Sequence, residues 1–347
     1  MTSKLNVMTN KFIQLENFYV KYYDELIIGK FSLQLFMNIH KDIRKSDVVH
    51  IQAIFNTPTP LTILLARLYG KPILISSRGS LDKWSLLKKT KWKHRWLNIF
   101  FKPFSKFIYW HATAEAERKA ILELFPNSNV TIIPNGISLK DYVNINNIVK
   151  IDYVKEYTNL TVTSVNKIII SMGRLHKKKG FDILIKSFNH ILKKFPNSYL
   201  LIAGPDGGEE KKLLSLIQSL ELKCNVFLIS AVNNQRKVDF LANSDVFVLP
   251  SYTENFGNVY IESLASGTPI VASKNTPWSK VEKCECGKWV ENSVDATTTA
   301  IFELLEQDRN ILRQNSINFA KDYEWKDIAI KFKNLYKKMQ KNVIYEK

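Results

Sequence analysis

From Asp47 onward, short apolar runs rich in β-branched residues alternate with amphipathic stretches roughly a dozen residues long. This alternation is typical of a parallel α/β sheet, because each crossover between parallel strands needs a helix-sized connection. The first half also holds helix candidates between its strands, for example at 60–70 and 113–125. Its candidate strands are 47–51, 72–76, 107–112 and 130–134.

The alternation stops at 137–166, a stretch rich in Asn, Asp and Lys that we interpret as a linker, and then starts again. The second set of candidate strands is 167–173, 198–205, 225–230, 245–250 and 269–273. A chain of 347 residues is longer than one core usually supports, so we predict two domains. The fold class is α/β, with two Rossmann-like doubly wound domains, 1–145 and 146–325, that face a cleft. An amphipathic helix over 326–347 would cross back to the first domain.

The chain carries a net charge of +18, from 50 Lys and Arg against 32 Asp and Glu. Such an excess indicates an anionic partner, which would be a nucleic acid, a membrane surface or a phosphorylated substrate. We find no helix-turn-helix, zinc-finger, RNP or KH signature, so we do not expect nucleic acid. Three cysteines without a nearby histidine do not suggest a metal site. With no membrane-spanning run and no secretory signal, we expect a cytoplasmic protein.

The basic segment SMGRLHKKKGFDIL leaves the first strand of the second half. Arg174 and Lys179 therefore lie in a loop at the carboxyl end of that strand, between Gly173 and Gly180. A guanidinium and an ammonium group at this place suit a diphosphate. The alternative is a solvated basic turn.

The segment PSYTENFGNVYIESLASGTPIVA holds two glutamates, Glu254 in a loop and Glu262 in the helix that follows. If the whole segment were helical, the two residues would be about 12 Å apart along the axis. That separation is too long for the acid and nucleophile of one glycosidic bond, which lie about 5 to 9.5 Å apart. We interpret the two carboxylates as holding separate hydroxyl-bearing parts of one extended ligand. The alternative is two solvated surface positions.

These two segments, with LLIAGPDGG and LANSDVFVLPS, resemble the nucleotide-binding half of retaining GT-B glycosyltransferases of family four, also called group 1. The resemblance implies that Arg174 and Lys179 contact the donor diphosphate and, with Glu254 at the donor sugar, are the catalytic residues. It implies that Glu262 holds the ribose hydroxyl groups. Further donor-binding positions would be Gly173, Asn255, Phe256, Gly257 and Asn258. The donor would be a UDP- or GDP-linked sugar, and the family uses neither a metal nor another cofactor.

The first half is similar to a subgroup of that family that builds cell-surface polysaccharides such as lipopolysaccharide or capsule. The similarity lies in DVVHIQAIF, SSRGSLDKWSLLKK and HATAEAER, and later in NTPWSKVEKCECGKWVEN. Many relatives have a histidine before the glycine where this chain has Arg78 and Gly79. Arg78 would contact the acceptor or the donor phosphate, or it is a strand-end arginine with a structural partner. The first twenty residues show no glycine-rich loop, so we expect an abbreviated opening strand or a chain that starts late.

A basic aromatic stretch lies between Lys83 and Trp110, in which cations without any acid alternate with aromatic residues. This composition is typical of a helix on an anionic lipid leaflet. The alternative assigns the later aromatics to the core and the lysines to solvent. The cations are Lys83, Lys88, Lys89, Lys91, Lys93, Arg95, Lys102 and Lys106.

The sequence therefore predicts a retaining, metal-independent hexosyltransferase that moves a sugar from a nucleotide sugar to a hydroxyl group of a lipid-linked surface glycan. Its expected location is the cytoplasm, peripheral to the inner face of the plasma membrane. The competing hypothesis is a catalytically silent GT-B protein that binds a glycan or a protein partner.

Overall fold

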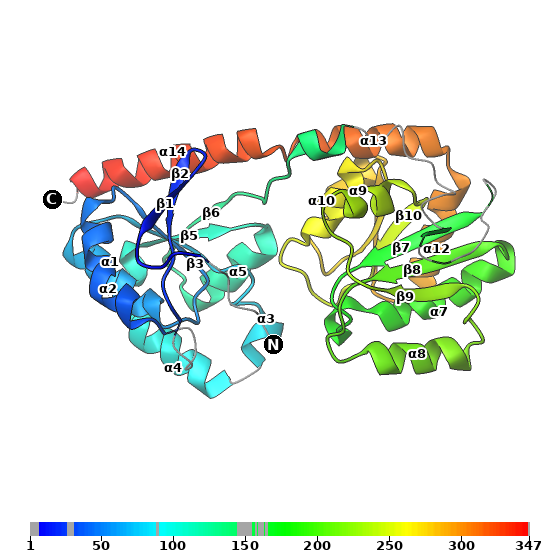
Figure 1. Cartoon of the computed structure of the whole chain (residues 1–347), viewed down its shortest axis with the longest axis horizontal. Helices are drawn as coiled ribbons and strands as arrows, with labels where there is room; N and C mark the ends of the chain where they lie inside the picture. Colours follow the sequence, from blue (N-terminus) through cyan, green and yellow to red (C-terminus); the bar gives the residue numbers. More distant parts are fainter. Residues whose placement is uncertain are drawn as a thin grey trace. The chain divides into compact units, whose positions relative to one another are not determined.

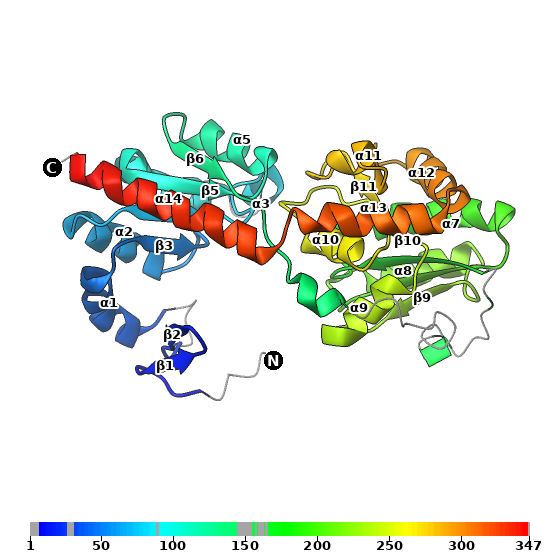
Figure 2. The same ribbon diagram turned by 90° about the horizontal axis from the view of Figure 1, so that it is seen from above.

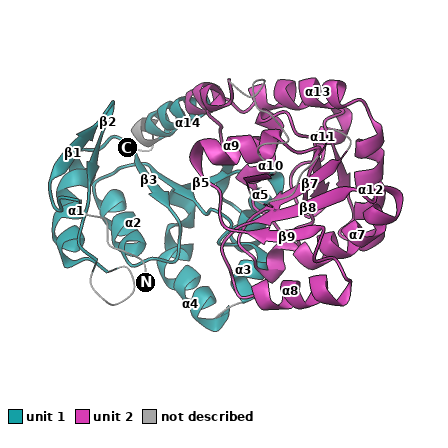
Figure 3. Ribbon diagram, turned by 45° about the vertical axis from the view of Figure 1, so that its right-hand side comes forward, with its two compact units in different colours: residues 1–133, 331–347 teal, residues 134–330 magenta. Residues whose placement is uncertain are grey.

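The computed structural model describes residues 7–25, 31–87, 90–143 and 166–345, with a few single positions between 155 and 163. Figure 1 labels most of its helices and strands. The chain divides into two compact units, residues 1–133 with 331–347 and residues 134–330 (Figure 3). Each unit is described below by itself. None of the described helices is long and apolar enough to cross a membrane.

The first unit contains a parallel four-stranded sheet with the order β3-β4-β5-β6. All four strands were predicted, and they are β3 (Val49–Gln52), β4 (Ile73–Ser76), β5 (Ile108–Ala112) and β6 (Asn129–Ile132). The connecting helices are α2 (Pro58–Leu68), α3 (Lys83–Leu87), α4 (Thr90–Phe100), the 3-10 helix η1 (Lys102–Phe107) and α5 (Glu115–Leu124). Both halves were predicted to be doubly wound, but the strand order of the first unit does not reverse within its described residues.

One face of this sheet carries the apolar core, with Ile51, Ile75 and Trp110 packed against Ile63 of α2 and Ile121 of α5. The other face meets the C-terminal helix α14 (Trp325–Tyr345), which from residue 331 belongs to the first unit, as predicted. Figures 1 and 2 both show α14 running alongside this sheet.

A hairpin and a helix precede the sheet, in a part of the chain for which we expected an abbreviated opening strand or a late start. The hairpin consists of β1 (Phe12–Leu15) and β2 (Phe18–Lys21), and the helix is α1 (Leu33–Lys45). Asp42 of α1 holds the hairpin through Lys21, at 3.1 Å, and through the Tyr23 hydroxyl, at 3.2 Å. Ser32 caps the first turn of α1 by accepting a bond from the Leu35 N–H.

The second unit contains a parallel six-stranded sheet with the order β12-β11-β10-β7-β8-β9. Five strands were predicted: β7 (Lys167–Met172), β8 (Ser198–Ala203), β9 (Val226–Ile229), β10 (Val246–Leu249) and β11 (Ile270–Ser273). The sixth, β12 (Gly287–Val290), was missed because it is a half-buried edge strand with a lysine in its middle. The chain runs outward from β7 to β9 and then returns to β10 beside β7, which is the doubly wound arrangement.

The helices of the second unit alternate with its strands. Where a helix is amphipathic, its apolar side faces the sheet, as α7 shows by burying Leu184, Phe188 and Ile191. The helices are α7 (Phe181–Lys194), α8 (Glu210–Ser219), α9 (Asn234–Ala242), α10 (Asn258–Ala265), α11 (Lys280–Lys283), α12 (Val294–Glu306) and α13 (Arg309–Lys321). Two 3-10 helices, η2 (Leu139–Tyr142) and η4 (Lys177–Lys179), complete the unit.

The start of the predicted linker is part of the second unit. The N–H of Ile137 donates to the carbonyl of Tyr323 at 2.8 Å, and the N–H of Trp325 donates to the carbonyl of Ile137 at 3.0 Å. Tyr142 is buried in the core of this unit. The boundary between the units therefore lies at Ile133 and Pro134 rather than at 145 and 146. Most of the predicted linker beyond residue 143 lies outside the described residues.

Candidate functional site

The two motif-bearing loops of the second unit meet where the strand order reverses. Strands β7 and β10 are paired side by side, and each loop leaves the carboxyl end of one of them. The loops are in contact, because the N–H of Tyr252 donates to the carbonyl of Lys178 at 2.9 Å. Gly180, in the left-handed region at φ 68°, lies so close to the Pro250 carbonyl that a Cβ would collide with it. Open α/β sheets bind their ligands at this kind of switch point.

Lys179 and Glu254 form an ion pair at this switch point, from Nζ to Oε1. Only 21% of the lysine side chain and 12% of the glutamate side chain are exposed. Gly173 lies beside them, since a Cβ at this position would be 3.3 Å from Lys179 Cε. The structure thus brings together three residues that the sequence singled out at 173, 179 and 254. It also shows that the lysine is paired with a carboxylate.

Arg174 lies next to this pair on the chain and is exposed. Its aliphatic part covers Gly207, where a Cβ would lie 2.7 Å from Arg174 Cγ. Leu175 fixes the loop by donating its N–H to the Pro205 carbonyl at 2.9 Å. Among the described residues, no carboxylate pairs with the Arg174 guanidinium. The GPDGG segment after β8 therefore supports the arginine without neutralising it.

Phe256 anchors the loop before α10 to the core of the second unit. Its ring is buried against Trp278, at 5.0 Å between centroids, and its carbonyl accepts a bond from the Trp278 indole N–H at 2.7 Å. Gly257 caps α10 in the left-handed region, and Asn258 begins the helix. The Asn258 side-chain oxygen accepts a bond from Asn135 at 2.8 Å. Phe256 thus serves the predicted site by holding the loop backbone in place, with its ring in the core.

Glu262 lies in the second turn of α10 and faces α9. Its Oε1 is 2.7 Å from Lys237 Nζ, and 21% of the glutamate side chain is exposed. Burial, and then the charge of Glu262, raise the pKa of the buried Tyr142 phenol. The sequence analysis identified neither Lys237 nor Tyr142. The only signal for Lys237 was its place in the first turn of the helix after β9.

In the first unit, Arg78 and Gly79 form a turn after β4 with both residues in the left-handed region, at φ 51° and 72°. The Arg78 Nε–H donates to the side-chain oxygen of Gln52 at 2.8 Å. Burial, opposed by the charge of Glu117, lowers the pKa of Arg78. The turn therefore has a defined conformation, and the Arg78 side chain makes a structural contact with Gln52 at the end of β3.

Glu117 holds this turn from inside the protein and was not singled out from the sequence. The residue is 5% exposed, and its carboxylate accepts hydrogen bonds from the Ser77 hydroxyl, the Gly79 N–H and the Thr113 N–H. Burial alone would raise its pKa, but these hydrogen bonds outweigh burial and hold the pKa below its usual range. Glu117 is therefore a buried anion that holds the Ser77–Gly79 turn in place through hydrogen bonds.

A chain of hydrogen bonds crosses the other face of the same sheet. His50 lies 2.8 Å from the Tyr336 hydroxyl of α14 and 2.7 Å from the Ser76 hydroxyl. Ser76 is 2.7 Å from His111, whose other nitrogen is 2.7 Å from the carbonyl of Ile133. Burial, the neighbouring His111 and Arg78 lower the pKa of His50 to about 4. Both rings are neutral at pH 7, because burial also lowers the pKa of His111.

The basic aromatic stretch divides into a core side and an outer side. Phe101 and Trp110 are fully buried, as the alternative reading expected for the later aromatics. Trp92, Ile99 and Leu87 are exposed by 49%, 59% and 74%. The exposed cations beside them are Lys83, Lys91, Arg95, Lys102 and Lys106. Lys88 and Lys89 lie outside the described residues.

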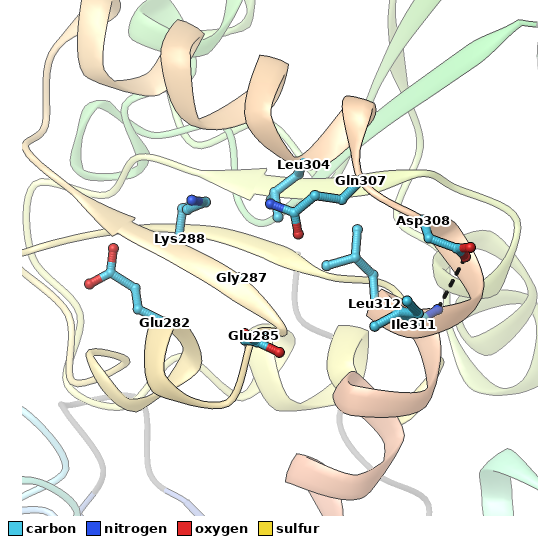
Figure 4. Close-up of a pocket in the computed structure, with 9 residues that line it drawn as sticks. All are labelled: Glu282, Glu285, Gly287, Lys288, Leu304, Gln307, Asp308, Ile311 and Leu312. Atoms are coloured by element: carbon cyan, nitrogen blue, oxygen red, sulfur yellow. Dashed lines mark hydrogen bonds between the residues drawn. The ribbon is translucent and has the colours of Figure 1, made fainter.

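A separate pocket lies between β12, α12 and α13, lined among others by Glu282, Glu285 and Lys288 (Figure 4). Asp308 at its rim caps α13 by accepting a bond from the Asn310 N–H at 2.7 Å. None of the predicted catalytic, donor-binding or acceptor-side residues lines it. Across the described part of the chain, no group of three or more His, Cys, Asp or Glu side chains is placed to hold a metal ion.

Comparison with known proteins finds relatives of the second unit. Residues 159–323 match the family described as glycosyl transferases group 1. The second unit is therefore similar to group 1 glycosyltransferases. An uncharacterized glycosyltransferase of Haemophilus influenzae is 31% identical over 62% of this chain and 59% of its own length. A GDP-mannose:cellobiosyl-diphosphopolyprenol alpha-mannosyltransferase of Xanthomonas oryzae is 23% identical over 85% of this chain and 74% of its own length.

Solved structures with the same fold cover most of this chain. The HepE protein of Anabaena, crystallised with UDP, superposes with a TM-score of 0.72 at 18% identity, over 88% of this chain and 82% of that one. The predicted GT-B fold is confirmed by such neighbours. The chain spans about half the length of the first curated relatives it matches, from 42% to 59%.

Proposed function

We propose that the protein is a retaining, metal-independent hexosyltransferase that transfers a sugar from a nucleotide sugar to a hydroxyl group of a lipid-linked surface-polysaccharide acceptor. The observation that carries the proposal is the meeting of the Gly173–Lys179 loop with Glu254 at the switch point of the second sheet. This edge of the sheet suits a sugar linked to a diphosphate, because a basic loop, a partly buried carboxylate and the first turn of a helix lie there together.

In the proposed reaction, Arg174 and Lys179 bind the donor diphosphate. As the bond between the anomeric carbon and the diphosphate oxygen breaks, negative charge grows on the leaving group and these cations stabilise it. The acceptor oxygen attacks from the same face, and its proton passes to the departing phosphate oxygen. Glu254 orients the sugar, while its pairing with Lys179 keeps the ammonium group in place. Rate acceleration then comes from positioning and electrostatic stabilisation.

The acceptor and donor classes rest on relatives and on the surface of the first unit. The Xanthomonas relative acts, by its name, with GDP-mannose on a diphosphopolyprenol-linked glycan, and the HepE structure holds UDP. We propose a UDP- or GDP-linked donor for this chain and a lipid-linked glycan as acceptor, with Arg78 and Gly79 on the acceptor side. The exposed apolar and basic side chains of α3, α4 and η1 would hold the cytoplasmic protein at an anionic inner membrane face.

A nucleotide-sugar panel tests the proposal. Thermal unfolding is measured with UDP-, GDP- and ADP-sugars, and transfer is then assayed with the donor that stabilises the protein. We expect one nucleotide class to raise the unfolding temperature, because a ligand that binds only the folded state stabilises it. Stabilisation without transfer to any lipid-linked acceptor would instead favour the catalytically silent protein. No stabilisation by any of the three would contradict the donor site itself.

A further inference from the structure

The carboxylate of Glu262 is held by a second charged residue, Lys237. Lys237 Nζ lies 2.7 Å from Glu262 Oε1, and the two side chains are 26% and 21% exposed. An exposed ion pair of this type contributes little to stability, whereas a partly buried pair restricts the rotamers of both side chains. Lys237 thus restrains the orientation of the Glu262 carboxylate.

The position of this pair in the fold indicates a role in ligand binding. Lys237 lies in the first turn of α9 and Glu262 in the second turn of α10, and these helices follow β9 and β10. Both helices therefore start at the carboxyl edge of the sheet, where ligands of such sheets bind. An ion pair whose only role was to join the two helices could equally well lie near their C-terminal ends.

The Glu262 carboxylate can accept hydrogen bonds from a ligand while it is paired with Lys237. A carboxylate accepts at about four lone-pair sites, while an ammonium group only donates. Lys237 occupies Oε1, so other acceptor sites of the carboxylate stay available for hydroxyl groups. The Tyr142 phenol keeps its proton, because burial and the Glu262 charge raise its pKa.

We infer that Lys237 is a positioning residue that orients the Glu262 carboxylate toward the ribose hydroxyl groups of the nucleotide. This inference rests on the proposed function, since it assumes a nucleotide donor in the second unit. Through Glu262, Lys237 makes the site discriminate between ribonucleotides and their deoxy analogues. Lys237 itself contributes no contact to the diphosphate or to the base.

The experiment measures dissociation constants of UDP, GDP and ADP, each beside its 2′-deoxy counterpart, for the full-length protein by calorimetry. Wild type binds the ribonucleotide about 10- to 100-fold more tightly than the deoxynucleotide, because a hydroxyl bonded to a charged group is lost. Lys237→Met weakens ribonucleotide binding by about tenfold and leaves deoxynucleotide binding unchanged. Lys237→Arg recovers most of the discrimination, and in a Glu262→Gln background Lys237→Met has no further effect.

The matched control is Lys194→Met, which breaks the exposed Lys194–Glu306 pair in the same unit and leaves all binding constants unchanged. Equal weakening of ribo- and deoxynucleotide by Lys237→Met would overturn the inference, as would an unchanged preference for ribose. Either result leaves the proposed function intact, because wild type still binds a nucleotide. If wild type binds none of the three nucleotides, the proposed function fails and the inference fails with it.

Discussion

Lys179 and Glu254 form the pair on which the proposed chemistry depends most. We expect Lys179→Ala and Glu254→Ala to lower turnover by about 10² to 10³, the usual loss when one charge-stabilising contact in an active site is removed. The measurement is the steady-state rate with saturating donor and acceptor. Circular dichroism of each variant shows whether the fold is kept, and Lys194→Ala serves as the exposed control. Turnover close to wild type in either variant would contradict the site assignment.

Glu117 is a buried residue whose loss affects both stability and the Arg78 turn. Glu117→Ala leaves the Ser77 hydroxyl and the N–H groups of Gly79 and Thr113 without their acceptor. We expect a loss of at least about 2 kcal/mol in the free energy of unfolding, measured by urea titration. Glu115→Ala, on the exposed side of the same helix, should cost less than about 0.5 kcal/mol. A Glu117→Ala variant as stable as the Glu115 variant would contradict this role.

Helix α14 is bound to the first sheet through His50, and this contact has a pH dependence. His50 stays neutral in the folded protein down to its pKa of about 4, while the unfolded chain takes up a proton near pH 6.5. Protonation therefore favours unfolding, so stability is lost as the pH falls from 6.5 toward 4. We expect the urea midpoint to fall over this range and to fall less in His50→Gln. Parallel pH profiles for the two proteins would refute the assignment.

The segment from α3 to η1 is the element that we expect to contact lipid. Lys91→Glu with Arg95→Glu should remove binding to vesicles of phosphatidylglycerol and phosphatidylcholine, since each cation near an anionic surface contributes about 1 kcal/mol. Co-sedimentation at low salt measures the bound fraction. Lys211→Glu with Lys223→Glu makes the same charge change on exposed lysines of the second unit and should leave binding unchanged. Equal losses in both variants would show a general charge effect in place of a specific surface.

The net charge of +18 belongs to the entire chain and makes weak binding to any polyanion unavoidable. We expect oligonucleotide binding at low salt to disappear by about 200 mM salt, because it depends on released counterions. Stabilisation by a nucleotide sugar should persist under the same conditions, since the Lys179–Glu254 site is largely buried and less screened. Fluorescence anisotropy and thermal unfolding in one salt series measure both. Oligonucleotide binding that resists salt would revive the nucleic-acid hypothesis.

The sequence by itself determined nine of the ten strands in the two large sheets and the motifs that follow them. The spacing of apolar residues and the positions of glycines are local properties of the sequence. They were therefore enough to find β7, β10 and the site residues Arg174, Lys179, Glu254 and Glu262 without a structure. The same rules missed β12, whose lysine and half-exposed edge weaken the apolar pattern. They also missed the β1–β2 hairpin, whose residues are mostly exposed.

Only the tertiary structure decided which of these residues meet. Lys179 and Glu254 are 75 positions apart and become partners because the strand order reverses between β7 and β10. Lys237 reaches Glu262 because α9 and α10 start at the same sheet edge, and Tyr336 reaches His50 because α14 returns to the first unit. The sequence also offered no means of separating Glu117, a buried anion, from the exposed Glu115 two positions before it. Local patterns record which element a residue belongs to, whereas pairing and burial depend on how those elements pack in space.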